Sequence, residues 1–278
     1  MCYDVVFKSV FLGNENILAK MISDITGFDY SILENNITLE CNELPIEIKG
    51  EKFKKCDFIV KVDKDMILNL ELNTKSYGGI LVKGLSYAFN LFSRHTLKGD
   101  TYNENLRITQ INMNYFGDEE KTLSKYLIKE IENNEIYSEN INFYVLNLVK
   151  CHQMYYNESE LEIPKYVKWG ALITFDNIED IPEIATGILE EKEIKIIMDK
   201  LNKLTNDDLF MSELEAQQWF EWEQRSIENS IRKEATEQKT IDVIKSMLEN
   251  KAEYGFISKV TNKTIEEIKE IEKSMETE

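Results

Sequence analysis

The segment 53–74 constrains the fold most, because two alternating stretches flank a short charged turn. FKKCDFIVKV and MILNLELNT both alternate in the manner of strands, and the turn between them is residues 63–65. A connection of three residues lies within the usual range for a β-hairpin. The sequence therefore predicts a hairpin in which Val62 pairs with Met66.

This register brings two carboxylates together. Counting outward from the turn places Asp57 opposite Glu71, and Asn73 shares the face of Glu71 because strand side chains alternate with period two. Carboxylates directly opposite each other on a sheet repel unless a cation neutralises them, and carboxylate oxygens suit Mg²⁺ or Mn²⁺. In the alternative interpretation this face looks into water, where two carboxylates cost little. The residues alone leave both open.

The segments around the hairpin alternate between helical and extended patterns. Apolar residues recur at helical spacing in 6–11 and 17–25, and a similar period returns in 78–97. Strands are predicted near 106–116 and 139–150. This mixed order of strands and helices indicates an α/β or α+β core.

The second half of the chain is mostly helical and acidic. A long helical run covers 212–238, and shorter helical periods follow on either side of Gly255, where Thr264 and Glu267 have the spacing of a capping box. We therefore expect a core in residues 1–155, a helical extension packed on it in 156–237, and a small helix-turn-helix-like appendage in 238–278.

The composition excludes several kinds of metal site. His95 and His152 are the only two histidines, so a multi-histidine site is excluded. The four cysteines form no C-x-x-C pair, so neither a zinc knuckle nor a disulfide framework is suggested. No apolar run reaches the roughly 18 residues of a membrane helix, and no secretory signal opens the chain. We expect a cytoplasmic protein that does not span a membrane.

The net charge of −18 argues against a surface that coats a phosphate backbone. The charges are unevenly distributed, however, because residues 45–110 contain eleven Lys or Arg against eight Asp or Glu. One basic face on an acidic molecule fits this distribution, and ordinary solvated charge fits it equally well.

Four short motifs follow one another in the first part of the chain. In order they are Asp4-Val-Val-Phe7-Lys8-Ser-Val-Phe11, Glu43-Leu44-Pro45, Asp57-Phe58-Ile59-Val60 and Ile67-Leu68-Asn69-Leu70-Glu71-Leu72-Asn73. No single motif is specific, but their succession resembles the PD-(D/E)XK nuclease superfamily and, within it, the Rpn-type recombination-promoting nucleases, also described as putative transposases. The resemblance covers residues 3 to about 116 well and the helical half loosely. It implies a restriction-endonuclease-like α/β core, with a central mixed sheet flanked by helices and a mostly helical C-terminal region.

The resemblance also implies an activity, that of a metal-dependent DNA endonuclease linked to recombination, transposition or phage defence. Asp57 and Glu71 would bind Mg²⁺ or Mn²⁺ with the backbone carbonyl of Leu72, and the metal would activate water. Further residues are implied by the family pattern: Asp4 and Glu15 would complete the site, and Lys8, Lys52 and Lys55 would neutralise DNA phosphates. For these five, solvated surface is an equally good interpretation.

The chain departs from the family pattern at Asn73. The superfamily commonly has Lys at this position and the Rpn branch usually has Gln, whereas Asn is shorter and uncharged. Lys75 has the same strand parity and would supply the missing charge if it bends back. The alternative function is a catalytically impaired family member that acts as a protein-binding or DNA-binding module. A homodimer and a regulatory protein partner stay open.

Overall fold

The chain divides into two compact units, Met1–Asn206 and Asp207–Glu278. Boundaries near 155 and 237 were expected, and these positions fall inside α5 (Leu148–Asn157) and α9 (Asp208–Glu249). The computed structural model describes residues 4–40, 43–44, 54–55, 57–76, 79–95, 101–117, 120–157 and 162–276.

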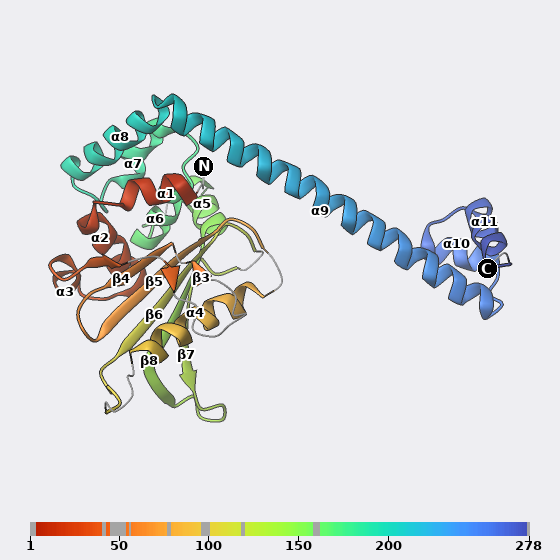
Figure 1. Ribbon diagram of the computed structural model, residues 1–278, viewed down its shortest axis with the longest axis horizontal. Helices are drawn as coiled ribbons and strands as arrows, with labels where there is room; N and C mark the ends of the chain where they lie inside the picture. Colours follow the sequence, from red (N-terminus) through yellow and green to blue (C-terminus); the bar gives the residue numbers. More distant parts are fainter. Residues whose placement is uncertain are drawn as a thin grey trace. The chain divides into compact units, whose positions relative to one another are not determined.

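A six-stranded mixed sheet forms the centre of the first unit (Figure 1). The strand order is β1-β4-β5-β6-β8-β7, with β5, β6 and β8 parallel and the remaining neighbours antiparallel. A separate two-stranded ladder joins β2 and β3. The strands are β1 (Thr38–Glu40), β2 (Glu43–Leu44), β3 (Lys54–Lys55), β4 (Phe58–Lys61), β5 (Met66–Asn73), β6 (Arg107–Asn114), β7 (Leu123–Lys129) and β8 (Ile136–Asn147).

Helices flank this sheet, so the expected central mixed sheet with flanking helices is confirmed. Gly27 ends α2 in the left-handed conformation at φ 77°, which glycine adopts readily. The helices of the first unit are α1 (Asp4–Phe11), α2 (Glu15–Thr26), α3 (Tyr30–Glu34), α4 (Ile80–Arg94), α5, α6 (Lys165–Ile173), the 3₁₀ turn η1 (Ile178–Asp180), α7 (Ile181–Ala185) and α8 (Glu191–Thr205).

The two faces of the sheet carry different helices. On one face Ile67, Ile108 and Ile141 pack against Tyr87 and Leu91 of α4. Tyr144 has the opposite parity on β8, and its hydroxyl donates to the carbonyl of Thr26 at the end of α2, 3.1 Å away. α4 and α2 therefore lie on opposite faces, and the strands between them are largely buried.

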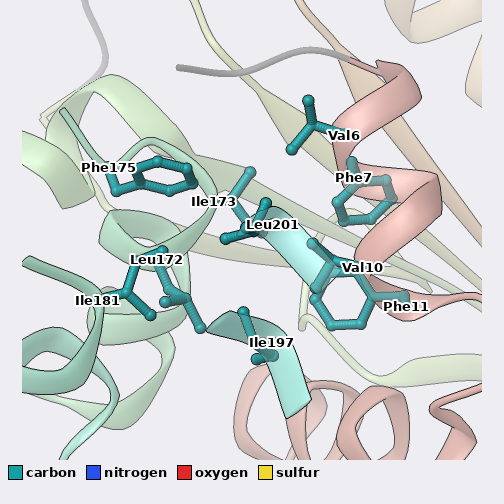
Figure 2. Close-up of a pocket in the computed structure, with 10 residues that line it drawn as sticks. All are labelled: Val6, Phe7, Val10, Phe11, Leu172, Ile173, Phe175, Ile181, Ile197 and Leu201. Atoms are coloured by element: carbon teal, nitrogen blue, oxygen red, sulfur yellow. The ribbon is translucent and has the colours of Figure 1, made fainter. Parts of the chain in front are cut away.

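Helix α1 is held by apolar contacts on two sides. Its residues Val6, Phe7, Val10 and Phe11 line an apolar pocket together with residues of α6, α7 and α8, as Figure 2 shows. The Phe7 ring also meets the ring of Phe58 in β4 edge-on, with centroids 5.5 Å apart. These contacts fix α1 beside the start of β4.

Two local expectations were wrong. Residues 148–150 were assigned to a strand, but β8 ends at Asn147 and α5 begins there, because the Asn147 side chain accepts a hydrogen bond from the Lys150 amide at 3.0 Å, as a helix cap does. Gly255 was expected to separate two helices, but it lies inside α10 (Tyr254–Thr261). The break comes earlier, near Lys251, which has a φ of 57°.

The second unit is helical. Ile244 of α9, Ile257 of α10 and Ile268 of α11 (Ile265–Glu276) are fully buried against one another. The predicted capping box is confirmed, because the Glu267 amide donates to Thr264 Oγ1 at 3.3 Å and the Thr264 amide donates to Glu267 Oε2 at 2.7 Å. Among the helices that the structure describes, none has the length and apolar character needed to cross a bilayer.

Candidate active site

The predicted register of the β4–β5 hairpin is confirmed. Phe58 pairs with Leu70 and Lys61 pairs with Ile67. Asp57 immediately precedes β4, and its Oδ2 accepts a hydrogen bond from the Leu72 amide at 2.7 Å. The hairpin therefore brings Asp57 to the end of β5 that carries Glu71 and Asn73.

Glu71 is a buried carboxylate with a lysine partner. The residue is 2% exposed, and its Oε2 lies 2.6 Å from Nζ of Lys83 in α4. Burial, followed by the nearby charge of Asp57, raises the pKa of Glu71 to about 7, although Lys83 opposes this shift. The interpretation in which this face looks into water is therefore wrong.

Asp57 also has a lysine partner, which comes from the opposite side of the site. Its Oδ1 lies 2.9 Å from Nζ of Lys8 in α1. Because Phe7 packs on Phe58, the neighbouring residues Lys8 and Asp57 are brought together. Each carboxylate of the pair is thus held by an ammonium group from a different helix.

Side-chain amides continue the polar face across the sheet. Strands β5 and β6 run parallel in a register that places Asn69 beside Gln110 and Asn73 beside Asn114. Asn69 donates to Gln110 at 2.8 Å, Gln110 donates to Asn112 at 3.0 Å, and Asn73 donates to Asn114 at 3.0 Å. Asn69 Oδ1 is buried and has no hydrogen-bond partner among the residues that the structure describes. This amide layer orients the side chains beside Glu71.

Lys83 is the site residue that the sequence analysis missed. Its Nζ lies 3.4 Å from Asn73 Oδ1 as well as beside Glu71, and 5.4 Å from the centroid of the Tyr87 ring. Gly84 lets α4 approach the sheet, since a Cβ there would lie 3.2 Å from Asn112 Nδ2. One feature of the sequence could have indicated Lys83: it is the single lysine in an apolar helix. It precedes Tyr87 by four residues, so the two side chains lie on the same helix face.

The donor atoms at this site fit a hard divalent cation. Asp57 and Glu71 offer carboxylate oxygens, which Mg²⁺ and Mn²⁺ prefer. The charge of Asp57 repels that of Glu71 and so helps to raise the pKa of Glu71. A divalent cation between them would remove this repulsion. Within the described part of the chain no three His, Cys, Asp or Glu residues gather into a metal-binding group. A divalent cation at this site would take its side-chain ligands from the Asp57 and Glu71 pair.

The remaining predicted site residues are distributed as follows. Glu15 begins α2 and acts electrostatically on Lys200 of α8, whereas the charged groups that shift the pKa of Glu71 are Asp57 and Lys83. Lys75 is half-buried and follows the last residue of β5 by two positions. Asp4 begins α1 and Lys55 ends β3, but the side chains of both lie outside the described structure, as does all of Lys52.

A mixed sheet with an Asp and a Glu facing each other on a central hairpin defines a PD-(D/E)XK-type nuclease core with a restriction-endonuclease-like fold. The model of the PD-(D/E)XK nuclease family transposases matches residues 1–230, and the chain belongs to this family. No curated protein and no solved structure matches the chain. The family resemblance noted in the sequence is confirmed, and membership of the Rpn branch stays a prediction consistent with it.

Proposed function

We propose that this protein is a metal-dependent DNA endonuclease that hydrolyses phosphodiester bonds. The observation that carries the proposal is the buried Glu71 carboxylate held beside Asp57 across the hairpin. A protein gains no stability from two carboxylates placed this way, so their arrangement favours a functional role. Membership of a nuclease family supports the same activity.

In this proposal Asp57, Glu71 and the backbone carbonyl of Leu72 would hold Mg²⁺ or Mn²⁺. When bound, the cation would supply Lewis-acid chemistry and neutralise developing negative charge. In the overall reaction the oxygen of a water molecule bonds to phosphorus, the bond from phosphorus to one deoxyribose oxygen breaks, the water gives up a proton, and the leaving oxygen takes one up. The chain contributes preorganisation, because the Leu72 amide and Lys8 fix both oxygens of Asp57 before substrate arrives.

The proposed DNA contacts are three lysines, Lys8 in α1 together with Lys52 and Lys55. Lys8 is partly exposed and neutralises Asp57, so it lowers the repulsion that a phosphate would meet at this carboxylate. Lys52 and Lys55 belong to the stretch 45–110, in which basic residues outnumber acidic ones. Because Lys8, Lys52 and Lys55 would displace the counterions condensed on the DNA phosphates, we expect DNA binding to weaken as salt rises. Recombination, transposition and phage defence of the Rpn type are the biological settings that we propose.

The proposal is tested with supercoiled plasmid in Mg²⁺, in Mn²⁺ and in EDTA. We expect nicking that requires metal in the wild type and is lost in Asp57→Asn and Glu71→Gln. Glu139→Gln, at an exposed position in β8, is the matched control and should nick at the wild-type rate. Nicking that persists in both site variants, or in EDTA, would contradict the assignment.

A catalytically impaired binding module is the second candidate, and Asn73 favours it. This residue has no charge where the superfamily commonly has lysine. If the protein is a binding module, plasmid should remain intact in every metal. The wild type should still bind DNA or a protein partner in a binding assay. The plasmid experiment therefore separates the two functions directly.

A further inference from the structure

The uncharged residue at position 73 leaves a chemical gap in the proposed active site. Asn73 is 7% exposed and donates its amide to Asn114, so this residue is held within the amide layer. An amide can hydrogen-bond to a phosphate, but it cannot supply the positive charge of a lysine. If the protein hydrolyses phosphodiesters, a lysine from another element can supply that charge.

Lys83 lies where that charge is needed. Its Nζ is 2.6 Å from Glu71 Oε2 and 3.4 Å from Asn73 Oδ1, so it contacts the side chains of both polar residues of the Glu71-Leu72-Asn73 motif. The Lys83 side chain is 28% exposed, whereas the Glu71 side chain is 3% exposed. The Lys83 side chain is therefore more accessible to a ligand from solvent than the carboxylate that it contacts.

We propose that Lys83 is a catalytic residue of the endonuclease and that α4 supplies the cation that β5 lacks. This assignment rests on the proposed function. The Lys83 ammonium donates a hydrogen bond to a non-bridging oxygen of the scissile phosphate. Negative charge on that oxygen grows as the water oxygen bonds to phosphorus and the bond to the leaving deoxyribose oxygen breaks. Lys83 keeps its proton throughout, so it stabilises charge without entering the proton transfers.

The geometry distinguishes Lys83 from Lys8 and Lys75, the two other lysines proposed for the site. Lys8 is paired with Asp57 Oδ1 and reaches the site from α1, at the first residue of the carboxylate pair. Lys75 lies beyond the end of β5. Lys83 contacts the motif at Asn73 itself, the position of the missing lysine.

A purely structural role for Lys83, neutralising buried Glu71, makes different predictions. Lys83→Gln retains a hydrogen-bond donor toward Glu71 but removes the charge. Asn73→Lys in the same chain then returns a lysine to the strand position that the superfamily uses. Relocating the charge in this way should restore catalysis if the cation acts on the substrate. Unchanged Mn²⁺ affinity and folding of Lys83→Gln separate that role from neutralisation of Glu71. Lys64→Gln is the matched control, because Lys64 is exposed in the turn at the other end of the hairpin.

The experiment measures single-turnover nicking of supercoiled plasmid, with Mn²⁺ affinity followed by electron paramagnetic resonance and folding checked by thermal unfolding. We expect Lys83→Gln to nick at least about 100-fold more slowly than wild type, the effect of removing one charge-stabilising donor. Mn²⁺ affinity should stay within a few-fold of the wild-type value, and Lys64→Gln should match wild type. The double variant Asn73→Lys/Lys83→Gln should recover about tenfold or more of the lost rate.

Three outcomes would overturn the assignment. A folded Lys83→Gln that nicks at the wild-type rate, beside an active wild type, would remove Lys83 alone and leave the proposed function standing. Loss of Mn²⁺ affinity or of the folded state in both Lys83→Gln and Lys83→Met, in parallel with loss of activity and without rescue by Asn73→Lys, would assign Lys83 a structural role. Absence of nicking by the wild type in every metal removes the proposed function and this assignment together.

Discussion

Glu71 is the residue at which the requirements of stability and of the proposed function oppose each other most clearly. The carboxylate is almost fully buried, and Asp57 adds repulsion that Lys83 only partly offsets, so that the pKa of Glu71 rises to about 7. Ionising Glu71 in the folded chain therefore costs free energy. A polar but uncharged side chain of the same shape would remove this cost.

We predict that Glu71→Gln stabilises the metal-free protein in a pH-dependent way. The folded-state pKa of Glu71 lies above its ordinary value of 4.5, so the folded chain binds more protons than the unfolded chain between pH 4.5 and 7, and stability falls as the pH rises through this window. The free energy of unfolding of the variant relative to wild type should grow across the window by roughly 3 kcal/mol and then level off. Urea unfolding in EDTA measures it.

Glu139→Gln is the control for this series, since Glu139 is exposed in β8 and its replacement should show no such trend. The opposite result is a free energy of unfolding of Glu71→Gln, relative to wild type, that stays constant across pH or shrinks toward neutral pH. Either outcome would contradict a raised pKa for Glu71 in the folded chain.

At the residue scale, sequence predicts what lies on one hairpin and misses what another element supplies. Asp57 and Glu71 could be paired because the turn 63–65 fixes a register in which every later pair follows by counting. Lys83 could not be placed in this way. Its position depends on how α4 crosses the sheet, which Gly84 and Asn112 decide through a contact between residues far apart in the chain.

At the scale of elements, the packing of α5 on α6 depends on one glycine. Gly170 of α6 lies against Cys151 of α5, and a Cβ at residue 170 would lie 2.8 Å from Cys151 Sγ, too close for an undistorted core. We predict that Gly170→Ala destabilises the first unit by about 1–3 kcal/mol or more through overpacking. Chemical denaturation measures the loss.

A double-mutant cycle identifies the cause of this loss. Cys151→Gly removes the side chain that Gly170→Ala would strike, so the double variant should be less destabilised than the two single variants together predict. Gly255→Ala is the matched control, because nothing lies within 4 Å of a Cβ at that position. Strict additivity of Cys151→Gly and Gly170→Ala would argue that the helices do not meet at these two residues.

Helix α8 is fastened to α2 by a buried charge. Glu193 is 1% exposed, lies 2.6 Å from Nζ of Lys20, accepts from Asn16 at 3.0 Å, and accepts from the Glu190 amide at 2.8 Å. We predict that Glu193→Ala costs about 3–5 kcal/mol of unfolding free energy, because it leaves a partly buried ammonium without its main partner.

The neighbouring substitution Glu191→Ala provides the comparison, since Glu191 is exposed in the first turn of the same helix and should cost much less. Equal losses for Glu191→Ala and Glu193→Ala in urea unfolding would mean that helix propensity, rather than the buried ion pair, sets the stability of α8.

The elements that sequence misjudged have physical explanations. β7 was not predicted, and its residues are mostly exposed at the edge of the sheet, where little apolar alternation is required. α5 was taken for a continuation of β8 because apolar residues run through the boundary, and only the capping bond from the Lys150 amide to Asn147 marks it. The amphipathic helices α1 and α2, by contrast, followed directly from their apolar period.

At the scale of the whole molecule, the proposed site lies entirely within the first unit. Asp57, Glu71, Asn73 and Lys83 belong to Met1–Asn206, whereas the cluster of Ile244, Ile257 and Ile268 belongs to Asp207–Glu278. The helical period and the capping box of the second unit could be predicted from sequence because both are local patterns. The separate core of the second unit could not be predicted, because residue spacing does not show which apolar helix faces pack against one another.

The last prediction follows from this division. The core of the second unit is small, so loss of one buried isoleucine, about 2–5 kcal/mol for Ile→Ala, should be enough to open it. Ile257→Ala should therefore lose amide protection in α10 and α11 while β5 and β6 keep theirs, as hydrogen–deuterium exchange with mass spectrometry can resolve. Val260→Ala, at a residue 54% exposed in the same helix, should leave protection unchanged. Metal-dependent nicking should persist in Ile257→Ala, and loss of protection in β5 would instead show that the two units fold as one.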